Sequence, residues 1–124
     1  MQQTALFTLK ATLCLLLFAL FCKPVPGQAD GAPAGEQLFM DHCASCHQIG
    51  RELTGPDLSY IQDKRELDWL VSFIKNPQAM ISSGDALAIE IYNNYEQVEM
   101  PANNLSEQEI LAVLGYIQSE SGKV

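Results

Sequence analysis

The chain has few basic side chains. Seven Lys and Arg stand against fifteen Asp and Glu in 124 residues. Residues 1–29 hold two of the basic side chains and none of the acidic ones, so residues 30–124 carry five basic and fifteen acidic side chains, a net charge of −10. Such a surface repels nucleic acid and anionic lipid headgroups, so the sequence disfavours DNA-binding and membrane-surface functions.

The sequence also lacks an apolar run long enough to cross a membrane. The longest unbroken one, residues 11–22, has 12 residues, whereas a membrane-spanning helix needs about 20. It follows Lys10 and precedes a segment that contains two prolines, a pattern typical of a secretory signal. We therefore predict that residues 1–29 are a cleaved signal peptide and that residues 30–124 form one exported, periplasmic domain.

Two other interpretations of the N-terminus stay open. Cys22 could become a lipidated first residue, although the bulky Phe21 before it argues against such processing. Residues 5–22 could also remain as an uncleaved anchor. N-terminal sequencing or the intact mass of the purified protein distinguishes the three.

Cysteine and histidine are scarce in residues 30–124, and they are clustered. The two cysteines there, Cys43 and Cys46, are followed directly by His47, and the other histidine is His42. A zinc site would need further Cys or His ligands, and a thioredoxin-like pair would need a strand-to-helix junction. The spacing Cys-X-X-Cys-His instead predicts covalent attachment of one haem c, with both thiols bonded to the vinyl groups and His47 as the proximal iron ligand.

The hydrophobic pattern predicts an all-α fold, because no alternating run is long enough for a strand. After a flexible segment at 30–35, helices are expected over 35–42, from Asp63 to shortly before Pro77, over 85–95 and over 106–122. Two of these starts have the spacing of a capping box, Asp63 with Glu66 and Ser106 with Glu109. The stretch 48–62 is expected to be a loop.

The ligand on the second face of the iron is expected to be a methionine. His42 and Met40 adjoin the attachment motif and lie on the proximal side. Met100 lies in an irregular segment between two helices, so it can reach across the distal face. Met80, expected in a loop after Pro77, is the competitor, and an open or exchangeable site is the third alternative.

On these motifs the chain resembles class I cytochrome c over the whole of residues 30–124. The resemblance implies that the N-terminal and C-terminal helices cross, with Gly35 and Phe39 on the first helix and Val113 and Tyr116 on the second. About four helices would then surround one haem.

The resemblance also implies hydrogen bonds to the proximal histidine and to the haem propionates. Gly55-Pro56 stands where the family places the carbonyl group that accepts the proximal Nδ1–H, so Pro56 would orient His47. Tyr60 and Trp69 are candidates for hydrogen bonds to a haem propionate. The acidic composition departs from the lysine-ringed eukaryotic members, so redox partners should present basic or apolar patches.

Histidine and methionine together would saturate the iron, which favours electron transfer over catalysis. The sequence therefore predicts a periplasmic one-electron carrier between respiratory proteins, and not an enzyme. The alternatives are a permanent haem subunit of a dehydrogenase or oxidase complex, and a haem enzyme or gas sensor with a displaceable distal ligand.

Overall fold

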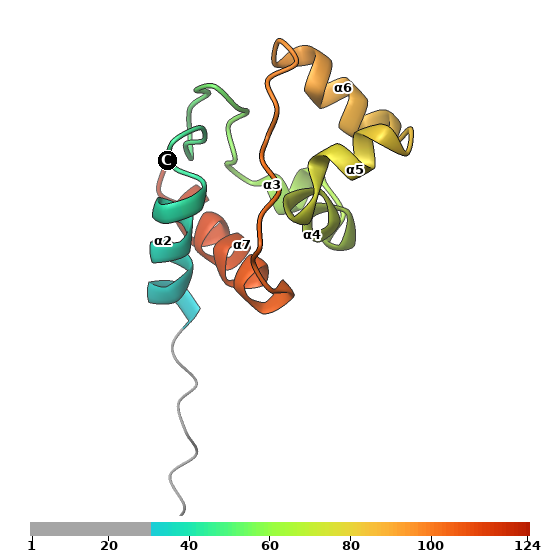
Figure 1. Ribbon diagram of the computed structural model, residues 1–124. Helices are drawn as coiled ribbons and strands as arrows, with labels where there is room; N and C mark the ends of the chain where they lie inside the picture. Colours follow the sequence, from blue (N-terminus) through green and yellow to red (C-terminus); the bar gives the residue numbers. More distant parts are fainter. Residues whose placement is uncertain (1–30) are drawn as a thin grey trace, which may run out of the picture.

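The computed structural model describes residues 31–124, which are entirely helical apart from turns and loops (Figure 1). The helices are α2 (Gly31–His42), α3 (Ile61–Lys64), α4 (Leu67–Lys75), α5 (Pro77–Ser82), α6 (Ala86–Asn94) and α7 (Glu107–Ser121). No strand occurs in this part of the chain, so the all-α prediction is confirmed. The predicted signal peptide, residues 1–29, and the anchor alternatives at Cys22 and 5–22 lie outside the described residues.

The C-terminal helix α7 begins as its sequence predicts. The Ser106 side chain accepts a hydrogen bond from the Glu109 backbone N–H, and the Glu109 carboxylate accepts one from the Ser106 N–H at 2.7 Å. This reciprocal capping satisfies N–H groups that the first helical turn leaves without partners. Four apolar residues at helical spacing form the buried stripe of α7: Ile110, Val113, Leu114 and Ile117.

Helices α2 and α7 lie side by side and cross at Gly35 (Figure 1). A Cβ added to Gly35 would overlap the carbonyl group of Ala112 and lie 3.0 Å from Cβ of Tyr116. One turn along, the rings of Phe39 and Tyr116 pack with centroids 5.5 Å apart at 51°. The predicted crossing is present, and glycine is needed there because only its backbone lets the helices approach so closely.

Two expected helix starts were wrong. Helix α2 begins at Gly31 rather than at 35, because Pro33 falls in the first turn, where a helix does not need its missing N–H. The expected helix from Asp63 is two helices, α3 and α4, separated by Arg65 in an extended conformation with φ −143° and ψ 144°. Glu66 caps α4 with its backbone and makes no side-chain capping bond, so no Asp63–Glu66 capping box forms.

Pro77 does not follow the end of a helix in a loop, as expected, but begins α5. It occupies the first helical position, and the preceding Asn76 accepts a hydrogen bond from the Ala79 N–H at 3.1 Å. Met80 is therefore a helical residue and not a loop residue. This difference arises because proline favours the first turn of a helix as well as the region after one.

The core lies where α7 packs against α2, α4 and the segment that leads into α7. Its buried apolar members besides the stripe of α7 are Phe39, Leu70 and Leu105. Among residues 31–124 no helix is long and apolar enough to cross a membrane.

Candidate haem site

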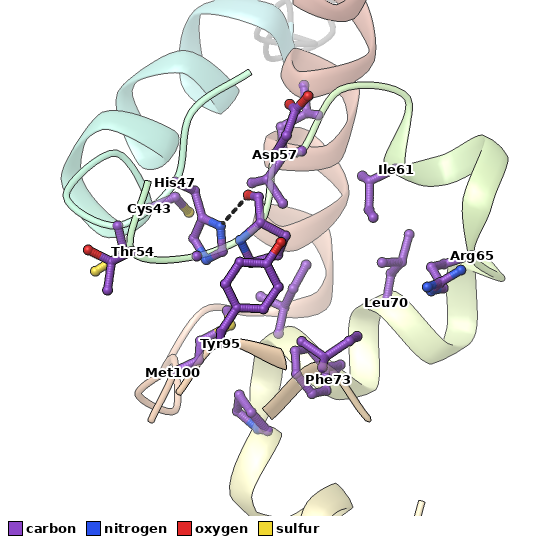
Figure 2. A pocket seen from close by; sticks show the side chains of 18 of the residues that line it. Cys43, His47, Thr54, Asp57, Ile61, Arg65, Leu70, Phe73, Tyr95 and Met100 are labelled. Carbon is purple, nitrogen blue, oxygen red and sulfur yellow. Dashed lines mark hydrogen bonds between the residues drawn. The ribbon is translucent and has the colours of Figure 1, made fainter. Parts of the chain in front are cut away.

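A cavity of about 730 Å³ separates the loop after α2 from the segment that joins α6 to α7 (Figure 2). It brings together six of the predicted site residues: Cys43, Cys46, His47, Pro56, Trp69 and Met100. Its walls are largely apolar and include Leu70, Phe73, Ile74, Leu105 and Leu114. A cavity of this size and lining suits a largely apolar cofactor with few polar contacts.

The attachment motif is held as a continuation of α2. The Cys43 N–H donates to the carbonyl of Phe39 at 2.8 Å, and the His47 N–H donates to the carbonyl of Cys43 at 2.9 Å. One turn of backbone therefore presents both thiols and the imidazole to the same cavity. Among residues 31–124 neither Cys43 nor Cys46 forms a disulfide. Burial raises the pKa of the Cys43 thiol to about 11, so its surroundings favour an uncharged sulfur such as that of a thioether.

The imidazole of His47 is fixed by the Gly55-Pro56 pair. Its Nδ1 lies 3.0 Å from the carbonyl oxygen of Pro56. A carbonyl can only accept, so Nδ1 carries the proton and Nε2 keeps its lone pair for a metal. Gly55 packs on the ring, because an added Cβ would lie 2.8 Å from Nδ1 and 2.9 Å from Nε2. The contact expected for Pro56 is therefore present, and Gly55 makes it sterically accessible.

Residues 48–60 form the loop that follows the attachment motif, the proximal loop. Asp57, which the sequence analysis did not single out, holds this loop together. Its Oδ1 accepts hydrogen bonds from the backbone N–H groups of Gly50, at 2.7 Å, and Ser59, at 2.8 Å, and its Oδ2 accepts one from the Ser59 hydroxyl at 2.7 Å. Burial alone would raise the Asp57 pKa, but these bonds and the charge of Lys64 lower it overall. The Asp-X-Ser spacing, which allows an aspartate to bond the backbone two residues on, was the available signal.

Met100 is carried by the irregular segment between α6 and α7. The turn at its start has two residues in the left-handed region, Glu96 at φ 55° and Gln97 at φ 59°. Its far end is tied to α4, because the Asn103 N–H donates to the carbonyl of Lys75 at 3.2 Å and the Asn103 side chain donates to that of Ile74 at 3.3 Å. Sequence patterns did not reveal the role of Asn103, because its partners are backbone groups of a distant helix.

The other candidate methionines do not line the cavity, whereas His42 lines it beside the attachment motif. Met80 is half-buried in α5 and does not line the cavity, and Met40 on α2 is 58% exposed. His42 ends α2 as an exposed residue beside the attachment motif. Among the candidate methionines, Met100 is thus the one that the fold brings to the cavity with His47 (Figure 2).

The structure gives the two aromatic candidates for a propionate contact different roles. The Trp69 indole N–H donates to the carboxylate of Asp85, at 3.2 and 3.3 Å from its two oxygens, and the ring stacks on Phe73 with centroids 4.8 Å apart. Its single donor is therefore already used. Tyr60 is 41% exposed and lies outside the cavity lining, and among residues 31–124 the one hydrogen bond that it donates runs from its backbone N–H to Ser121.

Another tyrosine, Tyr95, connects the two chain segments on either side of the cavity. The Tyr95 hydroxyl at the end of α6 donates to Oε1 of Glu52 in the proximal loop at 2.8 Å. Burial, followed by the hydrogen bond to Glu52, raises the Tyr95 pKa. This bond joins the loop that carries Gly55 to the segment that leads to Met100, and its 43-residue separation hid it from sequence analysis.

These residues fit a covalently attached haem. Two free thiols and an imidazole with a fixed tautomer lie on one turn, a thioether enters from another segment, and apolar side chains make the wall. Imidazole and thioether are the axial donors of electron-transferring c-type haems.

Comparison with known proteins agrees with this geometry. The family profile described as Cytochrome c matches residues 32–121. The chain is 30% identical over 93 residues to the photosystem II extrinsic protein V of Cyanothece sp., which covers 67% of this chain and 56% of that protein. It is 28% identical over 115 residues to a cytochrome c6-like protein of Nostoc sp., with 93% of this chain and 94% of that one covered.

A solved structure, the cytochrome c of Rhodothermus marinus, superposes with a TM-score of 0.70 at 27% identity, covering 78% of this chain and 82% of that chain. The chain spans just over half the length of the Cyanothece relative and nearly all of the Nostoc relative.

Proposed function

We propose, from the premise that the chain belongs to the cytochrome c family, that it is an exported one-electron carrier and catalyses no reaction. Membership makes it an electron-transfer haem protein with one covalently bound haem c, Cys43 and Cys46 standing at the attachment positions. The proposal has three further parts: iron ligation by His47 and Met100, a periplasmic location, and exchange of electrons between soluble partners.

One observation carries the proposal: His47 and Met100, from segments far apart in the sequence, line one cavity with apolar walls. The bond to Pro56 keeps Nε2 of His47 available as a donor, and the ties of Asn103 to α4 hold the segment that presents Met100. The bound haem supplies reversible one-electron redox chemistry. With His47 and Met100 as its ligands the iron would have no position open to a substrate, and the thioether together with the apolar wall would favour the reduced state.

Replacement of the thioether tests the carrier function. In the Met100→Ala variant, the weak long-wavelength absorbance band of iron–thioether ligation should disappear from the oxidised protein, and carbon monoxide should bind promptly to the reduced protein. The Met80→Ala variant is the matched control, because Met80 lies outside the cavity lining. Prompt, complete carbon monoxide binding to the unmodified protein at neutral pH would instead support an enzyme or gas sensor.

A permanent haem subunit is the second candidate function, and it is favoured by the Cyanothece relative, whose name describes an extrinsic protein of photosystem II. The charge of residues 30–124 suits a partner with basic or apolar docking patches in either case. Purification under mild conditions separates the two functions. A free shuttle should elute from the column as an isolated protein, whereas a subunit should co-elute with its complex at moderate salt.

Export to the periplasm is supported by the composition of residues 1–29 and by the haem itself, since covalent attachment in bacteria takes place outside the cytoplasmic membrane. Fractionation of the native cells, with N-terminal sequencing of the recovered protein, tests it. A mature chain that begins near residue 30 supports cleavage, and one that keeps residues 5–22 supports the anchor.

A further inference from the structure

We propose that the hydrogen bond between Tyr95 and Glu52 controls how readily Met100 leaves the haem iron, because this bond holds the distal segment against the cavity. The distal segment is the irregular stretch between α6 and α7, residues 95–106. The inference rests on the proposed ligation of iron by His47 and Met100, and it deepens that proposal by naming the side chains that regulate ligand exchange there. Tyr95 and Glu52 act through the backbone of the distal segment, so they are positioning residues.

The bond joins the two sides of the cavity. The Tyr95 hydroxyl donates to Oε1 of Glu52 at 2.8 Å. Both residues line the cavity that also contains His47 and Met100. In Figure 2 the Tyr95 side chain lies toward the same end of the cavity as His47 and Met100, and Leu70 lies toward the other. The bond therefore connects the loop that follows His47 to the segment that carries Met100.

The Glu52 end of this bond is fixed to the proximal side. The Gly55 N–H donates to the carbonyl of Cys46 at 2.9 Å, and the Leu53 N–H donates to the carbonyl of Gly55 at 3.1 Å. Gly55 in turn packs on the ring of His47. Because Glu52 belongs to this well-tied loop, the part that moves when the bond breaks is the distal segment.

The Tyr95 end belongs to a stretch with few other ties. Asp85 holds the start of α6 by accepting a hydrogen bond from α4, and Asn103 holds the far end of the stretch by its bonds to the same helix. Among the hydrogen bonds of residues 31–124, that of Tyr95 is the one that joins residues 86–102 to a residue outside 85–103. Without it, hydrogen bonds of the described chain hold this stretch at its two ends alone.

The turn at the start of the distal segment is strained. Glu96 and Gln97 have φ values of 55° and 59°, a region that residues with a side chain seldom adopt. Such residues persist where the surrounding contacts hold them. The Val98 N–H donates to the carbonyl of Tyr95 at 3.0 Å, so Tyr95 anchors a turn that ends two residues before Met100. Release of the Tyr95 hydroxyl therefore lets the turn relax and draw Met100 from the cavity.

The bond can break without exposure of the core. Glu52 and residues 96–99 are exposed, so water competes for the carboxylate, and little apolar surface is uncovered when the segment moves. A bond from a hydroxyl to a carboxylate is nevertheless stronger than one between neutral groups. These properties suit a contact that opens rarely and closes again. The competing role is purely structural: the bond would stabilise the fold and leave the exchange of Met100 unaffected.

The test measures carbon monoxide binding to the reduced holoprotein at saturating gas. The iron–sulfur bond must break before carbon monoxide takes the vacated position, with no change in oxidation state, so the observed rate reports the departure of Met100. The variants are Tyr95→Phe, Glu52→Ala and the two combined. Glu52→Gln tests for rescue, because its amide oxygen still accepts the proton of the Tyr95 hydroxyl.

Two control variants separate local opening from other effects. Asn93→Ala removes the bond that Asn93 accepts from Gln97 at 3.3 Å, which lies within the moving stretch and joins residues outside the cavity lining. Gly35→Ala disturbs the crossing of α2 and α7, away from the cavity. If the rate merely followed global stability, Gly35→Ala would raise it as well.

Tyr95→Phe and Glu52→Ala should each raise the rate by about three- to tenfold, the effect of losing one hydrogen bond. The double variant should add nothing to the larger single effect, because both substitutions remove the same contact. Glu52→Gln and the two controls should stay within about twofold of the wild type. The long-wavelength thioether band should persist in all of them, because Met100 remains the ligand at equilibrium. If Glu52→Ala yields no holoprotein, Tyr95→Phe decides alone.

Wild-type rates in the single variants, additive effects in the double variant, or an equal rise in Gly35→Ala would each overturn this inference and leave the carrier function standing. Prompt carbon monoxide binding by the unmodified protein, or a thioether band that survives in Met100→Ala, would instead overturn the function on which it rests.

Discussion

Gly55 lies against the imidazole of His47 so closely that a Cβ at this position would stand 2.8 Å from Nδ1 and 2.9 Å from Nε2. The same ring bonds the carbonyl of the next residue, Pro56, at 3.0 Å. Two adjacent residues therefore determine both the tilt of the ring and the nitrogen that carries its proton. This pair makes the proximal side of the site rigid.

Gly55→Ala should displace His47, because the ring cannot move away without losing its bond to Pro56. We expect altered visible absorbance and a free energy of unfolding lower by about 1–3 kcal/mol, the range for overpacking at a close contact. Spectra and chemical denaturation of the holoprotein measure both.

Gly115→Ala is the matched control for Gly55. Gly115 lies in α7, and a Cβ added there would meet no neighbouring segment of residues 31–124 within 4 Å. The variant should therefore be stabilised by up to about 1 kcal/mol, because alanine favours the helix over glycine. A Gly55→Ala protein with an unchanged spectrum would contradict the expectation.

Gly35→Ala should weaken the crossing of α2 and α7. Its methyl group would overlap the carbonyl group of Ala112 and crowd Tyr116, so the helices must separate. A loss of about 1–3 kcal/mol in the free energy of unfolding is expected, with little change in the haem spectrum because the crossing lies away from the cavity lining. Stability equal to that of Gly115→Ala would show that the crossing adapts at no cost.

Tyr95→Phe should loosen the link between the proximal loop and the segment that carries Met100. The loss of the 2.8 Å bond to Glu52 is expected to cost about 1 kcal/mol. The raised pKa of Tyr95 sets the pH range of this effect. The folded state holds the phenol proton more tightly than the unfolded state, so the contribution is complete below the ordinary tyrosine pKa of about 10 and is lost as the pH rises through the folded value.

The measurement for Tyr95 is the unfolding free energy of the wild type and of Tyr95→Phe at pH 7 and at several values above about pH 9, the range that brackets the ordinary tyrosine pKa. Tyr92→Phe is the control on the same helix, because no hydrogen bond of its hydroxyl is found among residues 31–124. The difference between wild type and Tyr95→Phe should shrink at high pH, whereas that for Tyr92→Phe should stay small throughout. A difference for Tyr95→Phe that does not depend on pH would refute the assignment.

Asp57→Asn should destabilise the proximal loop near neutral pH. Its carboxylate accepts three hydrogen bonds, and its pKa is lowered in the folded protein despite the opposing effect of burial. A lowered folded pKa means that the stabilisation is present above the unfolded value of about 3.9 and is lost as the pH falls through the folded one. The wild type and Asp57→Asn should therefore differ in thermal midpoint at neutral pH, and the difference should shrink as the pH falls through the lowered pKa of Asp57.

Asp63→Asn is the control for Asp57, because Asp63 is exposed and its carboxylate accepts no hydrogen bond within residues 31–124. Its thermal midpoint should follow the wild type at both pH values. Equal destabilisation by the two substitutions would mean that net charge, and not the loop network, is responsible.

The sequence predicted those features of the structure that depend only on residues close together in the chain. The spacing from Cys43 to His47, the capping pair Ser106–Glu109 and the apolar stripe of α7 each involve a single turn or helix, so composition and periodicity suffice for them. The same local rules failed at Arg65 and Pro77. Proline suits both the region after a helix and the first turn of one, so Pro77 alone left two outcomes open, and no local spacing showed the extended residue Arg65 between α3 and α4.

The sequence by itself thus determined the helical class, the covalent attachment motif and the acidic surface, because each is a property of residue types and short spacings. Only the tertiary structure decided which methionine shares a cavity with His47, which carbonyl its ring bonds, and that the indole N–H of Trp69 donates to Asp85. These contacts join residues separated by loops and helices, and their geometry exists only once the core has closed.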